Sequence, residues 1–100
     1  MTELTRENFN SVLEENEKIL IYFYLPEHGA SYLGFSLIEA VDQMIAKDFE
    51  IFTVQVDLQP EICDLLSNKD VPEYICIKNK KIHKRAVQLK YSNQVLDLLK

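Results

Sequence analysis

Two kinds of apolar pattern alternate along the chain, and together they predict most of its secondary structure. Short runs rich in β-branched and aromatic residues, at 18–25, 49–57 and 73–78, are typical of strands. Between them, apolar residues recur every three or four positions, as in amphipathic helices. The expected elements, in chain order, are a helix at 6–16, a strand at 18–25, a helix from 29 into the stretch that ends at 49, a strand at 49–57, a helix closing near 67–68, a hairpin of strands at 73–78 and 81–88, and a helix at 92–100.

The strand at 18–25, "KILIYFYL", shows no regular alternation of apolar and polar residues. A strand that is apolar on both faces belongs in the middle of a sheet that helices cover on both sides. Strand–helix–strand units require right-handed parallel crossovers, whereas the final hairpin is antiparallel. We therefore expect a single α/β domain spanning 1–100, with helices on both faces of a mixed four-stranded sheet, or a five-stranded one if residues 2–4 add a short strand.

The chain has no pattern that indicates membrane insertion or secretion. Its longest apolar run, "ILIYFYL", is far shorter than the roughly 20 residues of a membrane-spanning helix. The first residues, "MTELTRENF", are polar and lack the apolar segment of a signal peptide. We therefore expect a cytoplasmic protein with no membrane partner.

Two cysteines, Cys63 and Cys76, match neither a metal-binding spacing nor a Cys-x-x-Cys motif. Free thiols of this kind suit a reducing compartment, and we expect both to be small buried apolar residues. No metal site and no cofactor are predicted. A redox activity that acts through one of these two thiols is the alternative.

Basic residues concentrate near the C-terminal end of an otherwise acidic chain of net charge −5. The densest group, called here the basic strip, consists of Lys78, Lys80, Lys81, His83, Lys84 and Arg85. Lysines on the last strand of a sheet deter unwanted pairing with other strands, which is the simplest interpretation. The alternative is an acidic partner or RNA, but the overall acidic charge and the absence of interleaved aromatic residues argue against a nucleic acid.

The turn "LPEHGASY", residues 25–32, joins the first long strand to the following helix and holds the best candidates for chemistry. His28 near a helix N-terminus suits a base or an anion ligand, and Ser31 suits a nucleophile. No acid that would orient His28 is evident from the sequence alone, and Glu27 and Glu73 are the two that the expected fold would bring near it. A surface histidine at the start of a helix is the simpler interpretation.

Several segments, in order and at matching spacing, resemble the thioredoxin family. "LTRENF" is similar to the family's Leu-Thr-x-x-Asn-Phe at the first helix, and "ILIYFY" to its central strand. "VQVDLQP" and "VPEYICIKNKKI" are similar to the third strand and to the closing hairpin. The resemblance covers nearly all of the chain and implies a thioredoxin-like fold with a cis peptide bond before Pro72.

The residues that carry thioredoxin chemistry are absent. The family's Cys-Gly-Pro-Cys motif falls on His28, Gly29, Ala30 and Ser31. One thiolate of that motif attacks a disulfide and the other resolves the mixed disulfide, so a turn with neither sulfur supports no exchange.

The residues that support this chemistry have changed as well. The family's buried Asp, which relays a proton, falls on Tyr22, and its Lys partner falls on Thr53. The Trp before the first Cys falls on Glu27, and the Thr after the cis-proline falls on Glu73. The Gly beside which substrate backbone passes falls on Gln88. Because nucleophiles, relay and docking Gly have all changed, we expect no thiol–disulfide oxidoreductase activity.

A fold kept without its chemistry suggests a binding role. We expect an adaptor or chaperone-like module that binds another protein or peptide through the face around the degenerate turn. That face would include Pro26, Glu27, His28, Tyr32, Pro72, Glu73 and Gln88. Tyr24, Leu33 and Tyr74 would join the same patch, and the alternative is that Tyr24 and Leu33 are core residues.

Overall fold

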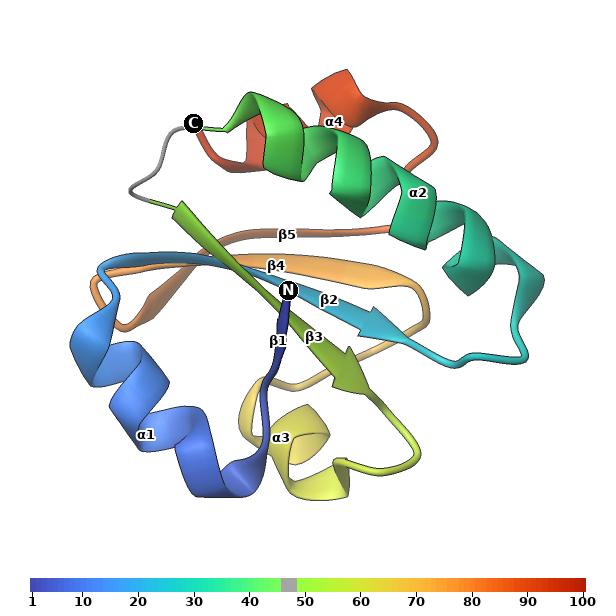
Figure 1. Cartoon of the computed structure of the whole chain (residues 1–100). Helices are drawn as coiled ribbons and strands as arrows, with labels where there is room; N and C mark the ends of the chain where they lie inside the picture. Colours follow the sequence, from blue (N-terminus) through green and yellow to red (C-terminus); the bar gives the residue numbers. More distant parts are fainter. Residues whose placement is uncertain (46–48) are drawn as a thin grey trace.

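The sheet of the computed structural model, which describes residues 1–45 and 49–100, has five strands in the order β1-β3-β2-β4-β5. β1 and β2 run parallel to β3, and β4 pairs antiparallel with both β2 and β5. Helices α2 and α4 cover one face, and α1 and α3 cover the other (Figure 1). The elements are β1 Thr2–Glu3, α1 Arg6–Glu15, β2 Lys18–Tyr24, α2 Gly29–Met44, β3 Phe49–Gln55, α3 Pro60–Leu65, β4 Glu73–Lys78, β5 Lys81–Val87 and α4 Ser92–Leu98.

The predicted fold class is confirmed, and the five-stranded form of the sheet is the correct one. Two boundaries differ from the prediction by more than a residue or two. α3 ends at Leu65 rather than near 67–68, because Ser67 takes a positive φ of 53° that no continuing α-helix allows. The end of the helix expected after residue 29 falls partly on 46–48, outside the described residues.

Two apolar cores lie on opposite faces of the sheet, and β2 contributes to both. Ile19, Ile21 and Phe23 pack with α1 and α3, while Leu20 and Tyr22 pack with α2 and α4. All five of these side chains are fully buried, so β2 has no solvent-facing side. The unbroken apolar run in the sequence is therefore the signature of the central strand, as predicted.

Local signals fix the ends of the elements around this sheet. Thr5 caps α1 by accepting a hydrogen bond from the backbone N–H of Asn8, whose side chain accepts one in return from the Thr5 N–H. This reciprocal pair satisfies two amides that the helix itself cannot. Among the described residues, no helix is both long enough and apolar enough to cross a membrane.

The β4–β5 turn yields a prediction about stability. Asn79 and Lys80 both have positive φ, 53° and 68°, as a tight hairpin turn requires, and this conformation strains a residue that has a Cβ. We expect Lys80→Gly to be about 0.5–1 kcal/mol more stable than Lys80→Ala. Both variants lose the exposed Lys80–Glu14 ion pair, so denaturant unfolding of the two isolates the backbone term. Equal stability of the two would contradict this account.

Candidate functional site

The turn between β2 and α2 places His28 on the surface, at the N-cap of α2. The His28 backbone N–H donates to the carbonyl of Leu25 at 3.0 Å, but its imidazole makes no capping hydrogen bond. Pro26, Glu27, Gly29 and Ala30 are also exposed. The turn therefore presents a small polar surface on which His28 has no orienting acid among its hydrogen-bond partners.

Ser31, in contrast, is buried, with 1% of its surface exposed. Its Oγ accepts a hydrogen bond from the Leu25 N–H at 3.2 Å, which ties the turn to the first turn of α2. Its backbone carbonyl accepts a hydrogen bond from the Tyr22 hydroxyl. Ser31 is thus engaged in holding the turn and is not presented as a nucleophile beside His28.

Tyr22, which the resemblance aligns with the family's buried Asp, places an aromatic ring in the core beneath α2. Its ring centroid lies 5.1 Å from those of both Tyr74 and Phe35. Burial raises the pKa of Tyr22 above its ordinary value and raises the pKa of Tyr74 to about 12. Both hydroxyls are therefore protonated at neutral pH and do not replace a proton-relaying carboxylate.

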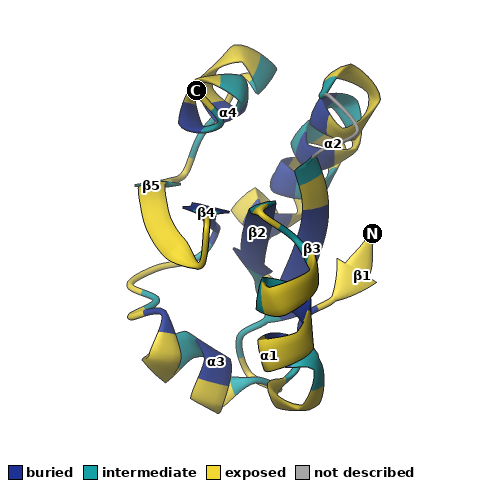
Figure 2. Cartoon of the chain, turned by 90° about the vertical axis from the view of Figure 1, so that its left-hand side faces the viewer, coloured by how far each residue is buried: buried dark blue, intermediate teal, exposed yellow. Residues whose placement is uncertain are grey.

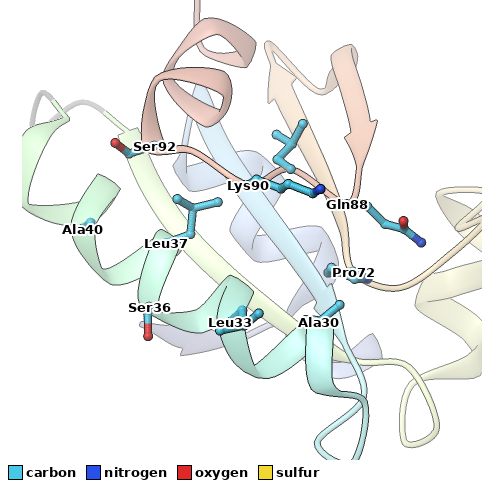
Figure 3. A pocket seen from close by; sticks show the side chains of 10 residues that line it. Ala30, Leu33, Ser36, Leu37, Ala40, Pro72, Gln88, Lys90 and Ser92 are labelled. Atoms are coloured by element: carbon cyan, nitrogen blue, oxygen red, sulfur yellow. The ribbon is translucent and has the colours of Figure 1, made fainter.

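The apolar groove lies beside the turn, between α2 and the segment that leads from β5 into α4 (Figure 3). Its volume is about 590 Å³. Apolar side chains dominate the lining, with one charged residue, Lys90. The lining residues are Ala30, Leu33, Ser36, Leu37, Ala40, Pro72, Gln88, Leu89, Lys90 and Ser92.

Two residues of the predicted face, Pro72 and Gln88, line the groove, together with residues that were not predicted. Pro72, preceded by a cis peptide bond, and Gln88 both line it, and the Gln88 N–H donates to the Pro72 carbonyl at 3.1 Å. Leu33 is 76% exposed and belongs to the groove, whereas Tyr32, equally exposed, lies outside its lining. Leu37, Leu89 and Lys90 were not predicted, because only the packing of α2 beside residues 88–92 brings them together.

Two tyrosines expected in the exposed patch pack against other aromatic residues instead. Tyr74 is fully buried in the core between the sheet and α2, and its hydroxyl has no hydrogen-bond partner among the described residues. Tyr24 is half-buried against Phe35 in the same aromatic cluster. The core alternative is therefore the better one for Tyr24, and Tyr74 is a core residue that was expected in the patch.

Glu73, which was predicted for the binding face, is the second correction, because it is buried with 1% of its surface exposed. Its carboxylate accepts hydrogen bonds from the Asn68 side chain at 2.6 Å and the Lys69 N–H at 3.0 Å, and it pairs with Arg85 at 2.9 Å. Arg85 in turn donates to the carbonyls of Leu66 and Ser67. A buried carboxylate needs such partners, and here they anchor the loop that leads to Pro72.

The basic strip is largely engaged with the protein itself. Lys80 pairs with Glu14 at 2.7 Å, Lys84 donates to the Asp97 carbonyl at 3.3 Å, and Lys78 lies over the Phe49 ring. A β-bulge lies in the same strand pair, next to Cys76 and Ile77. Lysines and bulges are both devices that protect an edge strand from pairing, as the simpler interpretation holds.

Both cysteines are shielded from solvent, Cys76 fully and Cys63 in part. Cys76 is fully buried in the core under α2 and α4, and Cys63 is half-buried on α3 with its thiol near the Val56 carbonyl. Burial raises the pKa of both thiols, and the Asp64 carboxylate raises that of Cys63 further. Residues 1–45 and 49–100 contain no group of three or more His, Cys, Asp and Glu side chains suited to a metal ion.

The order of the five strands, the helices on both faces and the turn before α2 define a thioredoxin-like fold. The chain is similar to a thioredoxin of Fasciola hepatica, with a TM-score of 0.88 and 21% identity, covering 99% of this chain and 96% of that one. It is similar to mitochondrial thioredoxin 3 of Saccharomyces cerevisiae, with a TM-score of 0.88 and 18% identity, covering 99% and 92% of the two chains. A Halobacterium salinarum NRC-1 thioredoxin mutant matches with a TM-score of 0.87 and 16% identity, covering 99% and 86%.

The TM-scores of 0.87 and 0.88 establish the fold, whereas identities of 16–21% leave the activity open. No protein-family model matches the sequence, and no curated protein matches it at a significant level.

The Tyr22 position yields the first prediction from the site. A Cβ added at Gly34 would lie 1.9 Å from the Tyr22 hydroxyl oxygen, whereas one added at Gly29 meets no atom within 4 Å. We expect Gly34→Ala to lower the free energy of unfolding by about 1–3 kcal/mol, and Gly29→Ala to leave it unchanged or slightly raised.

Tyr22→Phe removes the atom that lies nearest to the added methyl group. In a double-mutant cycle, the pair Tyr22→Phe and Gly34→Ala should therefore cost less than the sum of the two single changes. Urea unfolding of the four proteins measures this coupling. Additive effects, or a fully stable Gly34→Ala protein, would show that the two residues do not constrain each other.

The cysteines yield a prediction about reactivity. Because the thiolate is the reactive form and burial raises both pKa values, native Cys76 should react with a disulfide reagent only on unfolding, and Cys63 more slowly than glutathione. Both should react at once in concentrated guanidinium chloride. Native labelling of either thiol faster than glutathione would favour the alternative of a redox factor that uses these residues.

Proposed function

We propose that this chain is a redox-inactive thioredoxin-like protein that binds a peptide segment of a partner protein in the apolar groove. The observation that carries the proposal is the groove of about 590 Å³, open beside a turn that has no sulfur. We further propose that it acts in the cytoplasm, which two free cysteines suit.

Redox inactivity is supported by the chemistry of the turn. Thiol–disulfide exchange needs a thiolate at the helix N-terminus, and these positions hold an exposed histidine and a buried, hydrogen-bonded Ser31. The space of the acidic relay is filled by Tyr22, which is protonated at neutral pH because burial raises its pKa. The positions of the two thiols and of the acidic relay thus all hold other residues, namely His28, Ser31 and Tyr22.

Peptide binding is supported by the shape and composition of the groove. Leu33 is 76% exposed, and it lies next to Leu37 on the α2 side that faces residues 88–92 (Figure 3). A large apolar side chain left in water on a groove wall is typical of an interaction site. Covering it with an apolar side chain of a partner would remove this surface from water.

The test of binding uses random 12-residue peptides displayed on phage and selected on the wild-type protein. We expect the selected peptides to share apolar residues and to bind Leu33→Glu at least about tenfold more weakly, because a charge would then line the groove. The matched control is Leu65→Glu, since Leu65 is 52% exposed on α3, across the sheet from the groove. Selection of no peptide, or equal binding by Leu33→Glu, would refute the proposal.

Redox inactivity is tested separately by reduction of insulin with dithiothreitol. Addition of this protein should leave the rate at that of dithiothreitol alone, while a thioredoxin with Cys-Gly-Pro-Cys accelerates it. Acceleration that persists in a variant lacking both Cys63 and Cys76 would show a contaminant, and acceleration lost in that variant would overturn the proposed inactivity.

A further inference from the structure

We infer that the apolar groove binds a peptide segment that carries an apolar side chain next to an acidic one. In this inference, the ammonium group of Lys90 binds the carboxylate of the acidic side chain. This inference rests on the proposed function and names the chemistry of the partner. It depends on the charges around the groove, which the apolar lining alone does not specify.

Lys90 is the one charged residue among those lining the groove. It is exposed, and its ammonium group makes no ion pair or hydrogen bond with the residues that the structure describes. Its backbone is held in place, because the Lys90 N–H donates to the Gln94 side chain at 2.8 Å. A fixed backbone and an unpaired ammonium group on the groove wall favour a carboxylate at one position of the bound segment.

Asp70, two residues before Pro72 in the chain, is already hydrogen-bonded by its neighbours. The side chain of Gln88 points out of the groove (Figure 3) and its amide reaches the Asp70 carboxylate at 3.4 Å. Asp70 also accepts a hydrogen bond from the Val71 N–H at 2.8 Å and is not part of the lining. The lining itself therefore offers an incoming carboxylate one cation and no anion.

The apolar part of the same segment fits between the leucines. Leu33 and Leu37 come from α2, and Leu89 directly precedes Lys90 in the chain. An apolar side chain seated among these leucines would place its chain neighbours within reach of the lysine, whose flexible stem carries the charge. The expected ligand is thus a peptide segment with adjacent apolar and Asp or Glu residues.

Phage selection with charge variants tests this inference. We expect peptides selected on the wild type to be enriched in Asp and Glu next to the apolar residue, and those selected on Lys90→Glu to be enriched in Lys and Arg instead. Lys69→Glu is the matched control, because it makes the same change in net charge on an exposed loop residue outside the groove, and it should keep the acidic preference.

The affinity of a single selected peptide gives the quantitative measure, by fluorescence anisotropy. Replacing its Glu by Gln should weaken binding to the wild type by roughly two- to fivefold, the size expected for a partly exposed ion pair, and should not affect binding to Lys90→Met. Added salt should reduce the wild-type preference for Glu.

Three results would overturn the inference. Apolar peptides selected with no acidic preference would leave the proposed function standing and remove only the role of Lys90. An acidic preference that persists unchanged in Lys90→Met would place the recognition elsewhere. Displacement of the peptide by dodecanoate at micromolar concentration, lost in Lys90→Met, would assign the groove to a fatty-acid carboxylate.

Discussion

The burial of β2 on both faces is the constraint on which the rest of this structure depends. Ile19, Ile21 and Phe23 require α1 and α3 to cover one side, while Leu20 and Tyr22 require α2 and α4 on the other. Because side chains alternate along a strand, a shift of one residue would exchange the two cores and separate each helix from its partners. The turn after β2 and the start of α2 are therefore held at a fixed place above the sheet, and the residues of α2 that line the groove are held with them. Figure 2 shows β2 among the buried strands at the centre of the fold.

Tyr22 connects this constraint to the proposed absence of redox chemistry. The same side chain fills the core beneath α2, reaches Gly34 and donates to the Ser31 carbonyl. A position that serves a proton relay in the family that this chain resembles has become a packing position. The face above it still carries a groove of about 590 Å³ beside the cis peptide bond at Pro72. The features on which the proposed function rests, namely the packing of Tyr22, the turn before α2 and the groove, are therefore neighbours in the structure.

The fold was predictable from the sequence, because the unbroken apolar run of β2 and the helical spacing around it are patterns among residues close together in the chain. The location of the turn before α2 was also predictable, from the resemblance to the thioredoxin family. The details of the site were not. Glu73 looks like a surface residue until Arg85 and Asn68 are brought to it across the hairpin. Lys90 carries no local signal at all, since the groove exists only where residues 88–92 lie beside α2. Gly34 does carry a local signal, because glycine weakens a helix and here it lies in the middle of an apolar stripe. It marks the close approach of Tyr22 to α2.

The contact between Tyr22 and Gly34 also limits which changes at position 22 the fold tolerates. Cysteines introduced at positions 28 and 31 would supply two sulfurs, but the residue beneath them would be a buried tyrosine and not a carboxylate. Replacing that ring by a carboxylate would leave an unfilled volume against Gly34 and an unpaired buried charge, each of which lowers stability. The packing of one aromatic residue against one glycine therefore opposes the introduction of an acidic residue at this place in the core.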